Sequence, residues 1–203
     1  SSVVGATATT SYDGRGLPTT YTSAGATTDY CYDDEGGLTG MGVPHGTSCT
    51  AAPTGTTKKF TNDGFGRMIT SQTGSATAVN YTYDALSRLA TSSASGSTPA
   101  NGYVYQGPGT SLVKETVGNA LFASSPFGPL AQKSGGTTAY FLKDLHGDVV
   151  GLSQAGATSN LAATTFDPWG EVKGSAGTAT SLGFQGQITD KATPPALVDP
   201  ATI

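Results

Sequence analysis

The sequence NYTYDALSRL, residues 80–89, places a Tyr-Asp pair before a short break and an Arg-Leu pair after it. Taken alone, residues 84–90 are compatible with a short helix, because they contain no Gly. The arrangement occurs in three further stretches: SYDGRGLPTTY from Ser11, CYDDEGGLTGM from Cys31 and FTNDGFGRMIT from Phe60. Because these counterparts carry Gly in the break, they favour a turn over a helix at residues 84–90 as well.

The spacing of the stretches indicates a repeat. Asp13 lies 20 residues before Asp33. Asp63 lies 21 residues before Asp84, and the 30-residue gap after Asp33 holds one repeat plus an insertion. Weaker copies follow: YVYQGPG from Tyr103, LFASSPFGPL from Leu121, YFLKDLHGDVVGL from Tyr140 and TTFDPWGEV from Thr164. A period of about 20 residues accommodates two strands of about six residues and two turns of about four. Each repeat is therefore predicted to be a β-hairpin.

Each residue type in the repeat suits its place in a hairpin. Tyr favours a half-buried pleated surface, and Asp at the strand end can close a turn by accepting hydrogen bonds from the backbone. Gly16, Gly37 and Gly66 are expected to take positive φ in the turn. Arg, Leu or Met then begins the returning strand. The turn residues we select are Tyr12, Asp13, Gly16, Tyr32, Asp33, Asp63, Gly66, Arg67, Tyr83, Asp84, Arg88, Asp167, Pro168 and Gly170.

A single hairpin is marginally stable in water, so repeats of this kind must stack edge to edge. We therefore predict an all-β fold, in which stacked antiparallel β-hairpin repeats of about 20 residues form a continuous curved or spiralling sheet. Exposed edges of such a sheet predict self-association. The tyrosines are interpreted as structural, with no sign of a ligand-stacking platform.

Composition excludes several function classes. The net charge is −4, charged residues make up 12%, and the one pair of adjacent basic residues is Lys58-Lys59. Nucleic acid and anionic lipid are therefore not expected as partners. No apolar run approaches the length of a membrane span. Residues 1–10 lack the features of a signal peptide, which says little about where the protein goes.

The two cysteines, Cys31 and Cys49, enclose a segment rich in Gly, Pro and small polar residues. A disulfide between them would close a loop somewhat longer than the 15-residue case, worth about 3 kcal/mol in the chain-entropy model, and would favour an oxidising compartment. The alternative is two free thiols in a cytosolic protein. A zinc site that adds His45 is disfavoured, because no close Cys pair and no fourth ligand accompany it.

No motif predicts catalysis. His45 and His146 have no Ser or Cys motif that would supply a nucleophile. The acidic residues near Asp33 lack the alternating spacing of a calcium loop. We therefore expect no catalytic residue, no cofactor and no metal site.

The repeats resemble the YD repeats of the Rhs and teneurin-like family, most closely at YDGRGL, NDGFGRM and YDALSRL. Residues 140–172 are similar to the Rhs-associated core segment near the end of the repeat region. The resemblance implies YD repeats over residues 1–138 with a Cys-bounded insertion at 31–49, core-like repeats over 139–190, and a truncated tail at 191–203.

In that family the strands form a hollow shell around another polypeptide, often a toxin. The resemblance thus implies a structural shell segment of a secreted or cell-surface protein, with an enclosed toxin or further repeats as partners. One alternative is an adhesin-type module for carbohydrate or a host protein. A second is a self-cleaving aspartyl-protease-like core, for which Asp167, Asp190 and Asp199 would have to meet. No Arg follows Arg88 to assist them, so self-cleavage is not expected.

Overall fold

The computed structural model describes residues 8–23, 25–42, 57–94, 100–166, 170, 172–177 and 180–189, without the side chains of residues 23 and 173. Within these ranges the regular structure is strand, with two short 3₁₀ helices. The strands are β1 (Thr9–Tyr12), β2 (Pro18–Ser23), β3 (Ala26–Tyr32), β4 (Leu38–Met41), β5 (Lys58–Asn62), β6 (Met68–Thr73), β7 (Val79–Tyr83), β8 (Leu89–Ala94), β9 (Asn101–Tyr105), β10 (Leu112–Glu115), β11 (Leu121–Ser125), β12 (Gly128–Ser134), β13 (Thr137–Lys143), β14 (Val149–Ser153), β15 (Ala162–Phe166) and β16 (Val172–Gly177). The 3₁₀ helices are η1 (Val117–Asn119) and η2 (Phe184–Gly186).

The strands form one antiparallel, 16-stranded sheet in which the order of strands is their order along the chain. Every strand between β1 and β16 therefore lies between its two neighbours in sequence, as stacked hairpins require. The predicted all-β fold of stacked antiparallel hairpin repeats is confirmed. The predicted curvature concerns the overall shape and stays a prediction.

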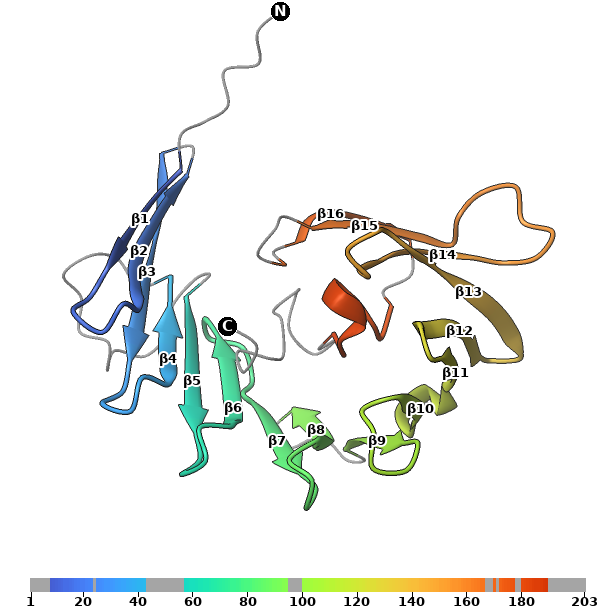
Figure 1. The fold of residues 1–203 in the computed structure, drawn as a ribbon, viewed down its shortest axis with the longest axis horizontal. Helices are drawn as coiled ribbons and strands as arrows, with labels where there is room; N and C mark the ends of the chain where they lie inside the picture. The colour runs from blue at the N-terminus through green and yellow to red at the C-terminus, as the bar shows by residue number, and fades with distance from the viewer. Residues whose placement is uncertain are drawn as a thin grey trace, which may run out of the picture. The chain divides into compact units, whose positions relative to one another are not determined.

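The chain divides into unit 1, Ser1–Asn80, and unit 2, Tyr81–Ile203, which we describe separately. Figure 1 shows the strands of each unit following one another in chain order. The predicted division into YD repeats, core-like repeats and tail has other boundaries than these two units, and it stays a prediction.

The first strand of six hairpins ends in a register shift. It falls between Ser11 and Tyr12 in β1, and between Cys31 and Tyr32 in β3. The strands β5, β11, β13 and β15 show the same irregularity near their ends. A bulge of this kind increases the local twist and re-aims the residues that follow it. The turns of these six hairpins are therefore entered from a similar backbone geometry.

Residues 84–90 form a turn followed by the start of β8, so the hairpin prediction holds there and the helical alternative is excluded. Cooperation with the neighbouring strands outweighs the helix preference of Ala85 and Leu86, as is common for short segments. A second turn connects successive hairpins. Gly25 and Gly74 take positive φ in two of these connections.

The buried apolar side chains differ between the units. Among the described residues of unit 1, those of Cys31, Met68 and Val79 are buried. Unit 2 has a continuous buried cluster, whose members are Leu112, Ala120, Phe122, Ala139, Phe141, Val149, Leu152, Ala162 and Leu182. Four partly buried side chains pack against this cluster: Tyr103, Tyr105, Leu161 and Ile188. The rings of Phe122 and Phe141 stack within it, with centroids 6.4 Å apart.

Residues 180–189 pack against the sheet of unit 2. The amide of Val149 donates to the carbonyl of Gly183 at 2.9 Å, and Leu182 and Ile188 pair as an isolated bridge. The ring of Phe184 lies 6.0 Å from that of Phe166. Leu182 is buried in the core cluster, so the hydrophobic effect also stabilises the packing of this segment on the sheet.

In the described part of the chain, no helix is long and apolar enough to cross a membrane.

Candidate functional site: the aspartate turns

The turn from Asp63 to Arg67 shows how the repeat closes. The carboxylate oxygen Oδ1 of Asp63 accepts hydrogen bonds from the amides of Phe65, at 2.9 Å, and Arg67, at 3.0 Å. The backbone closes the same loop, because the amide of Asp63 donates to the carbonyl of Arg67 at 2.8 Å. Gly66 takes a φ of 76°, the left-handed region that glycine adopts without strain. One aspartate thus satisfies the amides that the turn would otherwise leave unpaired.

The same closure recurs in both units. Oδ1 of Asp13, Asp84 and Asp144 also accepts from the amides two and four residues further on, at distances of 2.9 to 3.0 Å. Ser125 takes the place of aspartate in the β11–β12 turn, where its Oγ accepts from the amide of Phe127 at 3.1 Å. The turn is therefore a property of the repeat.

The second repeat corrects one prediction. The positive φ that we predicted for Gly37 belongs to Gly36, whose φ is 91°. Gly37 instead donates its amide to Oδ1 of Asp33 at 2.5 Å. A Cβ built on Gly37 would lie 2.7 Å from Oδ2 of Asp33 and 2.8 Å from Nδ2 of Asn62, so the two adjacent glycines serve different purposes.

Ser87 occupies the glycine position of the turn that follows Asp84. Its φ is 60°, so a residue with a Cβ adopts the left-handed conformation there. The amide of Ser87 donates to the carbonyl of Asp84 at 3.0 Å, as that of Gly66 does to Asp63 at 2.9 Å. Hydrogen bonding of the turn therefore holds Ser87 in a conformation that costs a non-glycine residue about 1 kcal/mol.

An arginine neutralises the carboxylate in three turns. Arg67 Nη2 and Arg88 Nη2 each lie 2.6 Å from Oδ2 of the aspartate four residues earlier. In the first repeat the arginine stands two residues after the aspartate, and Arg15 Nε lies 2.9 Å from Oδ2 of Asp13. Hydrogen bonds from the arginines hold the pKa values of Asp63 and Asp84 below the ordinary value of 3.8. The amide of Leu17 is the main cause of the lowered pKa of Asp13.

Arg88 also reaches the next hairpin. Its Nη1 donates to the carbonyls of Gly107 and Gly109, both at 2.7 Å, in the β9–β10 turn. Its guanidinium carbon lies 4.7 Å from the ring centroid of Tyr105, within cation–π range. A single side chain therefore closes its own turn and holds the following one. We call this arrangement the arginine staple.

Arg15 makes the equivalent staple in unit 1. Its Nη1 donates to the carbonyl of Asp33 at 2.9 Å and to that of Asp34 at 3.4 Å, in the β3–β4 turn. Burial, followed by the charges of Tyr30 and Asp13, raises the pKa of Tyr32, whereas the charge of Arg15 opposes that rise. In both units the donor arginine belongs to the earlier hairpin and the acceptor to the later one.

Two tyrosines of β9 complete the contact between hairpins in unit 2. The hydroxyl of Tyr105 donates to the carbonyl of Leu89 at 2.8 Å. The hydroxyls of Tyr103 and Ser92 are 3.0 Å apart. Burial is the main cause of the raised pKa of Tyr105. These phenols are therefore used for packing and for bonding between strands.

The turn of β13–β14 anchors the segment 180–189. The carboxylate of Asp148 is buried, and its Oδ1 accepts from the amide of Gln185 at 2.7 Å. His146 Nδ1 lies 3.2 Å from the same oxygen, and its ring lies 5.4 Å from that of Phe184. Here the repeat turn holds a segment that is not itself a hairpin.

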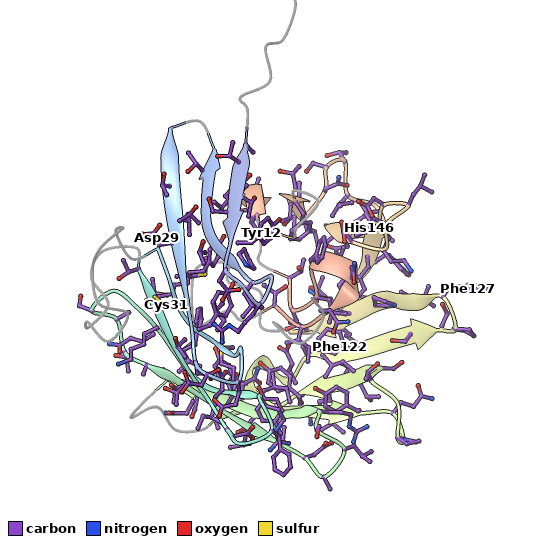
Figure 2. All side chains as sticks on the ribbon, turned by 60° about the vertical axis from the view of Figure 1, so that its left-hand side comes forward. Tyr12, Asp29, Cys31, Phe122, Phe127 and His146 are labelled. Carbon is purple, nitrogen blue, oxygen red and sulfur yellow. The ribbon has the colours of Figure 1, made fainter. Side chains whose placement is uncertain are left out.

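The tips of several turns expose apolar side chains. Phe65 is 85% exposed and Phe127 is 90% exposed, each two residues after the Asp or Ser that closes its turn. Leu86 is exposed at the equivalent position, and Leu145 is exposed one residue earlier in its turn. Figure 2 shows Phe127 at the end of its hairpin, pointing away from the sheet.

The remaining predicted site residues are placed as follows. Cys31 is buried in β3. Cys49, Asp167 and Pro168 lie outside the described residues, as do Asp190 and Asp199, so the disulfide, the last repeat turn and a meeting of carboxylates stay predictions. Within the described ranges, no three His, Cys, Asp or Glu side chains come together as metal ligands.

Our sequence reasoning did not select Arg15, Tyr105, Asp144 or Asp148 as site residues. Each stands in a stretch that the repeat alignment had identified. Aligning the turns on their closing residue, and not on the arginine, would have found Arg15, because that arginine is two positions out of register with Arg67 and Arg88.

No protein-family model and no curated protein matches the chain. Among solved structures, crystal structures of TcdB2–TccC3 with Cdc42 and of TcdB2–TccC3 are 14% and 15% identical over 79% and 78% of the chain, with TM-scores of 0.44 and 0.45. The Photorhabdus luminescens Tc holotoxin pore, with a substitution in TccC3, is 11% identical over 91% of the chain, with a TM-score of 0.40. The chain spans only 10% to 11% of the length of these matched chains. Likeness at these scores carries no argument about fold or function.

Proposed function

We propose that this chain is a structural wall segment of a secreted or cell-surface YD-repeat protein of the Rhs type, which encloses or presents another polypeptide. The observation that carries the proposal is the arginine staple. It is made once in each unit, by Arg15 and by Arg88, and each time it joins one hairpin to the next. A protein whose turn arginines join one hairpin to the next has the organisation of a wall.

The surface chemistry agrees with such a role. The strands are rich in Thr and Ser; for example, Thr22 and Thr27 bond each other across β2–β3, and Thr82 and Thr91 bond across β7–β8. Where hydroxyl side chains pair in this way, the sheet offers no apolar patch to an unfolded neighbour. A polypeptide held beside these strand pairs would accordingly meet a polar surface. The proposal includes no catalytic role and no cofactor.

Limited proteolysis of the full polypeptide that contains this chain tests the proposal. If the wall encloses another segment, that segment should resist a nonspecific protease at least about tenfold longer than the same segment produced alone, because cleavage then requires opening of the wall. Equal cleavage rates in the two settings would contradict the enclosing role. Mass spectrometry of the same sample also tests self-cleavage, for which we expect only the intact chain.

An adhesin-type binding module is the second candidate, favoured by the exposed rings of Phe65 and Phe127. Exposed aromatic rings are typical of sites that bind carbohydrate or protein surfaces. Binding to a glycan array or to host-cell protein that disappears in Phe127→Ser, and survives in the matched variant Leu145→Ser, would support this function. Absence of binding by the unaltered chain would remove it.

The oxidation state of the two cysteines tests whether the protein occupies an oxidising compartment, as a secreted protein does. Peptide mapping without reduction should recover Cys31 linked to Cys49. Recovery of both thiols in alkylated form would instead favour the cytosolic alternative.

A further inference from the structure

Among the described strands, β1 has a neighbour on one side only, whereas equivalent strands have two. The sheet order places β1 at one end, whereas β3 and β9 each lie between two strands. Tyr12 at the end of β1 is 64% exposed, but Tyr32 and Tyr105, which stand at the same place in β3 and β9, are partly buried. In the other two repeats an earlier hairpin lies beside the strand that carries the tyrosine.

The earlier hairpin supplies an arginine in both of those repeats. The guanidinium of Arg88 lies on the ring of Tyr105 and donates to the carbonyl of Gly107, two residues after that tyrosine. Arg15 donates to Asp33 and to Asp34, the corresponding residue of its turn. Gly14 holds this position in the first turn, and in the part of the chain that the structure describes its carbonyl accepts no hydrogen bond.

We propose that Tyr12 and the Gly14 carbonyl form a docking site for one further β-hairpin of this repeat class, which precedes β1 in the same polypeptide and places a turn arginine on Tyr12. The edge of β1 would pair with the second strand of that hairpin, as β3 pairs with β2. A guanidinium suits the site because it can stack on a phenol ring while it donates to two carbonyls. This inference rests on the repeat geometry and does not require that the wall encloses anything.

The direction of the staple argues against a second copy of this chain as the occupant. A copy that extended the sheet in the same sense would have to present its last hairpin, β15–β16, to β1. The turn of that hairpin reads Asp-Pro-Trp-Gly-Glu, and no arginine follows Arg88 in the sequence. The chain's own carboxyl-terminal edge therefore lacks the group that Tyr12 is placed to receive.

The test supplies the missing hairpin. Residues 1–7 of the full chain are replaced by a copy of residues 79–100, so that the copied β7–β8 hairpin runs into β1 as it runs into β9 in the native chain. The matched control carries Arg88→Gln in the copy alone. Tyr12 is then modified with tetranitromethane, and its nitration is quantified by peptide mass spectrometry alongside hydrogen exchange of residues 8–17.

Nitration of Tyr12 should fall about tenfold with the arginine-bearing copy, an effect of the size expected for a charge-assisted hydrogen bond with a cation–π contact. The control should lose most of that protection. The proposal is overturned if the copied hairpin and β1 stay unprotected from exchange, or if the control protects Tyr12 equally well. It is also overturned if Tyr12 of the native chain becomes protected as protein concentration rises, because a second copy would then be the occupant.

Discussion

The guanidinium of Arg88 and the ring of Tyr105 lie 4.7 Å apart, although they belong to different hairpins. The same guanidinium lies 2.6 Å from the carboxylate of Asp84. Arg88 thus takes part in a turn and in the contact between two turns. Loss of its charge should affect both, which makes it the most informative residue to replace.

Replacement Arg88→Gln should lower the free energy of unfolding by about 1–2 kcal/mol, because it removes charge-assisted hydrogen bonds at a partly exposed site. Urea unfolding followed by circular dichroism measures the change. Hydrogen exchange should show the loss concentrated in residues 105–111, where the staple ends.

Lys133→Gln is the control for that experiment. Lys133 is an exposed cation in β12 of the same unit, and its removal alters net charge by the same amount. It should change stability by less than about 0.5 kcal/mol. Equal effects of the two substitutions would show that net charge matters and that the staple does not.

Ser87→Gly should stabilise the chain. The substitution relieves the left-handed strain of Ser87, about 1 kcal/mol, and loses part of this gain to the greater freedom of glycine in the unfolded chain. The reverse change, Gly66→Ser, should destabilise it by a similar amount, since nothing lies within 4 Å of a Cβ at Gly66 and only the backbone opposes it. Thermal unfolding of the two variants should move in opposite directions.

Gly37→Ala should destabilise the second repeat by about 1–3 kcal/mol, because its methyl group would displace the side chains of Asp33 and Asn62. Asn62 then loses the hydrogen bond that its Nδ2 donates to the carbonyl of Leu38. Gly14→Ala is the matched control, as a Cβ there meets nothing within 4 Å. Chemical unfolding of both variants checks the contrast, and similar losses would contradict it.

Stability should depend on acid in a defined direction. Folding lowers the pKa values of Asp63 and Asp84 below 3.8. The stabilisation from the two ionised carboxylates is therefore fully present when the pH is above 3.8, and it is lost as the pH falls through the lowered pKa values of the folded chain. The melting temperature should hold between about pH 7 and pH 5 and drop below about pH 3.8. The double variant Asp63→Asn, Asp84→Asn should show a shallower acid transition, and an unchanged one would count against the ion pairs.

The hairpin fold could be predicted because its determinants are local. The aspartate, the residue with positive φ and the returning Leu or Met lie within a few positions of each other, so their spacing reports the turn directly. The exception at Gly36 and Gly37 shows the limit, because two adjacent glycines offer the same freedom and only the three-dimensional positions of the Asp33 and Asn62 side chains distinguish them.

The contacts between hairpins could not be read from the sequence in the same way. Arg88 and Gly109 are 21 residues apart, and nothing in either local sequence records that one donates to the other. The attachment of residues 180–189 is also non-local, because Asp148 and Gln185 meet only after the strands between them have paired. Periodicity predicts the repeat, whereas packing decides which repeats bond and through which atoms.

The one-way direction of the arginine staple bears on how such a gene can change length. Each of the two staples spans the distance from one hairpin to its successor, so a duplication that copies a donor hairpin together with the hairpin after it keeps donor and acceptors matched inside the copy. Recombination that separates the two hairpins would instead leave an arginine without its acceptor carbonyls.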